Sequence, residues 1–124
     1  MAVTYTNAVK IARMGAVTTQ AGTTAVLEIG TSAMGTILAS FTLNNPIAGA
    51  ATGAGVLSLS GFPKSASASA SGTAAAARIR TATGGTDIIT GLTVGTTGSD
   101  INLDSTSITS GQNVTINSAT ITHA

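Results

Sequence analysis

The chain has 124 residues, of which 73 are Thr, Ala, Gly or Ser, and its apolar residues never run 18 together. Only nine residues are charged, for a net charge of +1, and there is one His and no Cys or Trp. Without Cys the chain cannot form a disulfide framework, and without a long apolar run it offers no membrane span. Its titratable residues are too few for most enzymes, and its basic residues are too few and too scattered for a nucleic-acid surface.

Residues 4–20 are the one stretch with the 3.6-residue period of an amphipathic helix. Thr4 or Thr6 can cap its start and Gly22 is placed to end it, whereas Gly15 disfavours its second half. The apolar face carries Tyr5, Ala8, Val9, Ala12 and Ala16, and Lys10 and Arg13 lie away from it. This element either docks on a partner as an arm or covers one end of a sheet.

From residue 24 onward the apolar period changes to two, which is typical of strands. Residues 24–30 and 36–43 flank a short segment that contains Gly35, and this pattern predicts a β-hairpin. In the second of these strands one face is apolar and the other is mostly hydroxylic.

The middle of the chain is rich in Gly, Ala and Ser. Residues 47–55 hold too much Gly and Ala for a packed element, so we expect a loop there, and residues 56–60 resume the alternation of a strand. For residues 65–81 we favour one long strand, on which Arg78 and Arg80 point the same way. A helix through the alanines of this segment is the alternative.

Three further strands are predicted in the last forty residues. They cover residues 87–94, residues 100–104 together with 106–109, and residues 113–122, and glycines stand between them. The total is about seven strands after one helix.

These elements predict a mainly β fold in two parts. Residues 1–22 form a short N-terminal helix or arm, and residues 23–124 form an antiparallel β-sandwich or jelly-roll-like domain.

The motifs that carry chemistry are weak. His123 stands next to the C-terminal residue, a poor place for a catalytic base. The run from Asp100 to Asp104 imitates the opening of a calcium loop, but Gly111 stands where such a loop needs a bidentate Glu, and strand alternation fits the run better. We therefore predict no catalytic, cofactor-binding or metal-binding residues. The cationic pair Arg78 and Arg80 fits either an acidic partner surface or a solvated strand face.

Several segments together resemble a known group of proteins. The residues that carry the likeness are 5–14, 45–51, 55–57, 72–75, 78–80, 91–95, 98–103, 108–111 and 114–116. In these segments the chain resembles small Ala-, Thr- and Gly-rich bacteriophage virion proteins that accompany the major capsid protein. The likeness spans nearly the whole chain, although each motif is low in complexity.

This resemblance implies a capsid decoration, or cement, protein without catalytic residues or cofactors. It would be synthesised in the cytoplasm of a bacterial host and would bind the major capsid protein and copies of itself on the outside of the virion, with no nucleic acid or membrane as partner. The contact elements expected are the N-terminal segment through Gln20 and the loop over residues 44–55. The alternative is a tail-associated or fibre module that binds a host surface, for which the chain offers few aromatic side chains.

Overall fold

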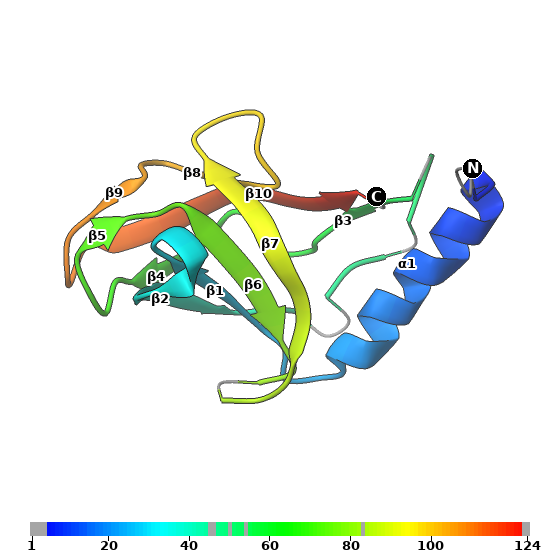
Figure 1. Cartoon of the computed structure of the whole chain (residues 1–124), viewed down its shortest axis with the longest axis horizontal. Coiled ribbons are helices and arrows are strands. Elements are labelled where there is room, and N and C mark those ends of the chain that lie inside the picture. The colour runs from blue at the N-terminus through cyan, green and yellow to red at the C-terminus, as the bar shows by residue number, and fades with distance from the viewer. Residues whose placement is uncertain (1–4, 45–46, 50, 54, 83, 123–124) are drawn as a thin grey trace.

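A computed structural model describes residues 5–44, 47–49, 51–53, 55–82 and 84–122, and it is mainly β, with 46% strand and 16% helix. The N-terminal helix α1 (Asn7–Ala21) lies at one end of a curled open sheet (Figure 1). The strands are β1 (Val26–Gly30), β2 (Ile37–Thr42), β3 (Val56–Ser58), β4 (Lys64–Ser67), β5 (Gly72–Thr73), β6 (Ala76–Arg80), β7 (Asp87–Gly95), β8 (Ile101–Leu103), β9 (Ser107–Ile108) and β10 (Asn113–Thr122). The mainly β fold with one N-terminal helix is thus confirmed.

The sequence signals for the ends of α1 are confirmed. Thr6 is the N-cap, and its side chain accepts a hydrogen bond from Val9 N at 3.4 Å. Gly22 ends the helix with a φ of 69°, a conformation that suits glycine. The second half forms in spite of Gly15, because α1 is held against the sheet by tertiary packing rather than by helix propensity alone.

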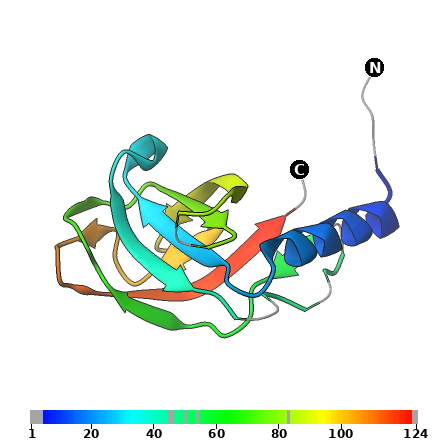
Figure 2. The same ribbon diagram turned by 90° about the horizontal axis from the view of Figure 1, so that it is seen from below.

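The face of α1 that packs on the sheet is not the apolar face expected from the sequence. Met14 and Ala21 are buried and Ile11 and Val17 are partly buried, and α1 contacts β3 and β7 through this side. The side that carries Val9 points to solvent. The helix therefore has apolar residues on two sides, and the sheet covers only one of them (Figure 2).

The predicted hairpin is confirmed. β1 and β2 pair antiparallel through a single turn of 3-10 helix, η1 (Ser32–Met34), with Leu27 opposite Phe41. All five residues of β1 are buried, because β1 also pairs with β6 on its other edge. This arrangement makes β1 a central strand.

Residues 65–81 do not form one long strand, and they form no helix either. The segment is divided among three strands with different neighbours: β4 pairs with β10, β5 pairs with β9, and β6 lies between β1 and β7. The chain bends at Ser69 and Ala70 after β4, where Ser69 N donates to Leu38 O on β2, and Ala74 and Ala75 separate β5 from β6. Small side chains allow these bends without steric cost, and the two-residue period alone does not reveal them.

The last forty residues differ from the expectation in two ways. β7, β8 and β10 are strands, but β8 runs parallel to β7, with Val94 opposite Ile101, whereas the other strand pairs are antiparallel. The chain leaves β7 at Gly95 and loops out before it returns in the same direction. Residues 107–108 form a separate strand, β9, that pairs with β5.

The sheet has eight strands in the order β2-β1-β6-β7-β8-β10-β3, and β4 also pairs with β10. β3 and β4 lie along the same edge of β10, one after the other. The core lies inside the curl. Its largest fully buried side chains are Phe41, Leu27, Ile29, Leu38, Ile47, Leu57, Ile79, Ile101, Leu103, Ile116 and Val114.

The segment expected as an unpacked loop contributes to this core. Ile47, Ala48 and Ala51 are 0%, 3% and 6% exposed, and Ala48 forms a β-bridge with Leu59. The expectation was wrong for these residues, because short Ala side chains and one Ile fit under the β3 edge.

Candidate functional site

Four charged side chains form one cluster on the sheet. Glu28 on β1 lies opposite Arg78 on β6, and Arg78 Nε donates to Glu28 Oε1 at 2.7 Å. Arg80 Nη1 lies 4.0 Å from the same oxygen, and Arg80 Nε lies 2.8 Å from Asp87 Oδ1. Glu28 is 5% exposed, so its charge is compensated inside the protein.

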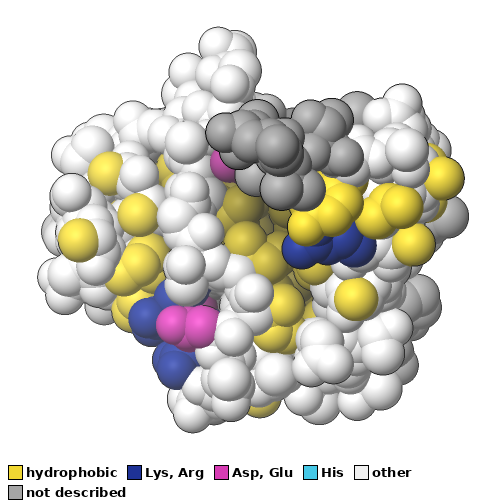
Figure 3. Space-filling view, turned by 45° about the vertical axis from the view of Figure 1, so that its right-hand side comes forward, with side chains coloured by type: hydrophobic (Ala, Val, Ile, Leu, Met, Phe, Trp, Pro, Cys, Tyr) yellow, Lys and Arg dark blue, Asp and Glu magenta, His cyan; other side chains and the backbone are white. Residues whose placement is uncertain are grey.

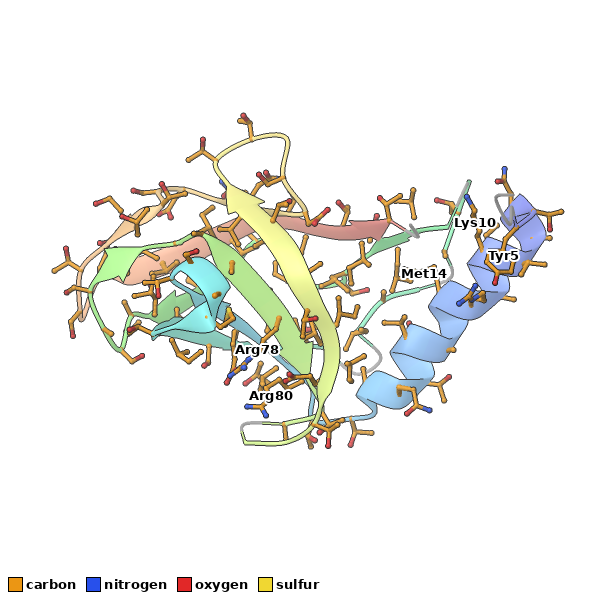
Figure 4. The ribbon with its side chains drawn as sticks, viewed as in Figure 1. Tyr5, Lys10, Met14, Arg78 and Arg80 are labelled. Carbon is orange, nitrogen blue, oxygen red and sulfur yellow. The ribbon has the colours of Figure 1, made fainter. Side chains whose placement is uncertain are left out.

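Arg78 and Arg80 do point the same way, as the alternation predicts (Figure 4). However, two arginines and two carboxylates leave the cluster with no net charge. Arg80 Nη2 also donates to Gly85 O at 2.5 Å, which anchors the turn before β7. The pair is therefore a structural network across β1, β6 and β7 rather than a cationic patch for an acidic partner.

The polar residues of the calcium-like run lie on strand β8 and its ends, as strand alternation predicts. Asp100 Oδ2 accepts from Thr93 N at 3.0 Å, and Asp104 Oδ1 accepts from Ser105 N at 2.9 Å. Asn102 contacts Ser118 on β10. Within the described ranges no three His, Cys, Asp or Glu side chains come together as a metal site would require. These groups close turns and pair strands.

A groove of about 300 Å³ lies between the edges of β2 and β4. The same two segments are joined by the hydrogen bond from Ser69 N to Leu38 O at 2.8 Å and by one from Lys64 Nζ to Asn44 Oδ1 at 2.7 Å. Hydroxyl groups of Ser40, Thr42 and Ser65 line it. Lys64 is the one titratable group there, so the groove holds no acid–base pair.

A second hollow, of about 350 Å³, lies between the end of α1 and the start of β7. It is lined by Gln20, Thr81, Thr86, Asp87 and Ile88. The carboxylate of Asp87 is already paired with Arg80. Neither depression therefore brings together groups that would catalyse a reaction or hold an ion.

The remaining feature is the outward side of α1. Tyr5 and Val9 are 43% and 42% exposed, and they are the only large hydrophobic side chains with such exposure in the part of the chain that the structure describes. The guanidinium carbon of Arg13 lies 4.6 Å from the centroid of the Tyr5 ring, a cation–π contact. Val9 and Arg13 are four residues apart and so share one side of the helix.

This surface lies far from the arginine cluster. Tyr5 and Lys10 lie near the start of α1, whereas Met14 points from the helix towards the sheet (Figure 4). Hydrophobic side chains gather beside basic ones on this side of the molecule (Figure 3). We call the exposed surface of Tyr5, Val9 and Arg13 the α1 outer face. Lys10, one turn before the buried Met14, is half-buried beside it.

Two segments were expected to contact a partner, and they differ in how much of their surface is exposed. The described part of the N-terminal segment leaves most side chains exposed. In the loop over 44–55 three side chains are buried in the core, which leaves less of it for contacts. Residues 1–4 and 45–46 and His123 lie outside the described residues.

The helical period was the signal for the α1 outer face, because it groups Ala8, Val9, Ala12 and Ala16 on one side. The expectation that Arg13 lies away from this side was wrong, because Arg13 is one turn after Val9 and its guanidinium contacts the Tyr5 ring. The helical period did not reveal that Tyr5, just before the cap, contacts Arg13, since that residue is not in the helix and its ring position depends on packing. No helix in the described ranges is both long and apolar enough to cross a bilayer. No family model, curated protein or solved structure matches this chain.

Proposed function

We propose that the chain is a non-enzymatic structural protein of a bacteriophage virion, a capsid decoration protein that binds and stabilises the shell of the major capsid protein from outside. In this proposal residues 23–124 are a rigid sandwich- or jelly-roll-like body and residues 1–22 are the arm that contacts the shell. Contacts between copies add to the binding, because many weak contacts on a lattice reinforce one another.

The observation that carries the proposal is the distribution of exposed bulky side chains. The sheet pairs four of its charges internally and shows a surface of small and hydroxylic residues, whereas Val9 on α1 and Tyr5 just before its cap are exposed. Exposed apolar side chains that cluster on one element are typical of a site that contacts another macromolecule. The resemblance to small virion proteins supports a capsid as that macromolecule.

The proposal is tested on the parent particle. Shells that lack this chain are mixed with the purified protein, and electron microscopy and thermal disassembly of the shells are compared with and without it. The proposal expects regular density on the outer surface and a higher disassembly temperature. Absence of bound protein on the shell refutes it, and density confined to the tail favours a tail-associated or fibre module that binds a host surface.

A further inference from the structure

The α1 outer face carries positive charge that the rest of the chain does not balance. Helix α1 holds Lys10 and Arg13, two of the five basic residues, and none of the four acidic ones. Within the described ranges neither makes an ion pair. All nine charged side chains lie inside those ranges, so this comparison covers every Lys, Arg, Asp and Glu.

The carboxylates of the chain are committed elsewhere. Glu28 and Asp87 pair with arginines, and Asp100 and Asp104 accept hydrogen bonds from backbone N–H groups of their own neighbourhood. Helix α1 itself holds none of them, so a second copy that packed α1 against α1 would bring no carboxylate to this face. If two copies packed α1 against α1, four positive charges would gather without a negative one, which is unfavourable in any antiparallel or parallel arrangement.

The surface is not suited to a lipid bilayer either. A helix that lies in the membrane interface needs a broad face of bulky apolar residues such as Leu, Phe or Trp. Here two bulky side chains stand beside Ala8, Ala12 and Ala16, which are short. Short side chains instead let a protein surface approach the helix closely.

We propose that the α1 outer face docks in an apolar groove of another protein whose rim carries Asp or Glu. In this arrangement Val9 and the Tyr5 ring fill the groove, and Arg13, held against that ring at 4.6 Å, faces a rim carboxylate. Tyr and Arg are the residue types that most often dominate the affinity of an interface, and a helix in an apolar groove is a common mode of recognition. The inference rests on the proposed function in that the groove belongs to the major capsid protein.

The test measures binding of the purified chain to capsid shells that lack it, at low and at high salt. Arg13→Gln is compared with Lys64→Gln, which removes the same charge from β4, far from α1 along the chain. We expect Arg13→Gln to weaken binding about tenfold and to reduce its salt dependence, and Lys64→Gln to change it less than about twofold. Val9→Ser should also weaken binding, and circular dichroism checks that every variant keeps its fold.

The outcomes separate the inference from the proposed function. If the wild-type chain binds shells and Arg13→Gln binds equally well, the docking chemistry is wrong and the decoration role stands. If the wild-type chain does not bind, both fail. Self-association of the chain alone that Val9→Ser abolishes, or binding of the chain to vesicles of equal parts phosphatidylcholine and phosphatidylglycerol, overturns the inference in favour of a second copy or a membrane.

Discussion

The Glu28 cluster makes a quantitative prediction about stability. Replacing Glu28 by Gln keeps the size of the side chain but leaves Arg78 and Arg80 with Asp87 as their one carboxylate. Two unit charges at the 2.7 Å separation of Glu28 and Arg78 attract by about 6 kcal/mol at an effective dielectric constant of about 20. Most of this is offset, because burial of the carboxylate costs solvation.

Access of solvent to the two arginines further reduces the stability that is lost. The Arg78 and Arg80 side chains are each 22% exposed, against 6% for that of Glu28, so both guanidinium groups can turn partly to water when the carboxylate is removed. Gln also keeps an oxygen that accepts a hydrogen bond. We therefore expect Glu28→Gln to lower the free energy of unfolding by about 2 kcal/mol, a large part of the 5–15 kcal/mol typical of a domain.

The assay is urea unfolding followed by circular dichroism, with the slope of the transition checked for constancy. A double-mutant cycle with Arg78→Gln isolates the pair, and the double variant should be more stable than the sum of the two single losses predicts by about 1 kcal/mol. A loss below about 0.5 kcal/mol for Glu28→Gln, which is typical of a surface substitution, would refute the reasoning.

Four further substitutions test the packing in the same unfolding assay. Ile79→Ala, at a side chain that is 0% exposed in the centre of the sheet, should cost about 2–4 kcal/mol, and a smaller loss would mean that the core collapses around the gap. Gly15→Ala should stabilise the chain by about 0.5–1 kcal/mol, because nothing lies within 4 Å of the added methyl. Gly30→Ala should destabilise it, because that methyl would stand 2.7 Å from Thr36 O, and equal effects at the two glycines would contradict this packing. Thr18→Val should stabilise by about 1 kcal/mol, because the Thr18 hydroxyl is buried and finds no hydrogen-bond partner among the described residues, and a loss would show that this hydroxyl is hydrated.

The role proposed for α1 requires that different residues of one short helix attach it to the sheet and contact the partner. Met14 and Ala21 attach it to the sheet, and Val9 and Arg13 face outward. Changes to the outer face should therefore alter binding with little effect on stability. Changes at Met14 should lower stability before they alter binding, because they loosen the helix from the sheet.

Local signals in the sequence were sufficient where a single element decides the structure. The caps Thr6 and Gly22, the hairpin of β1 and β2 and the alternation of β10 follow from side-chain chemistry within a few residues of each other. The same signals placed Arg78 and Arg80 on one face of β6.

Only the tertiary structure decided what depends on residues far apart in the chain. Three features need partners found many residues away: the division of residues 65–81 into three strands, the parallel approach of β8 to β7, and the pairing of Glu28 with Arg78. The side of α1 that is covered was decided in the same way, because both sides carry apolar residues and only the shape of the sheet end at β3 and β7 favours Met14 over Val9. Small side chains leave many pairings sterically possible, so the sequence of this chain specifies its strands more strongly than their neighbours.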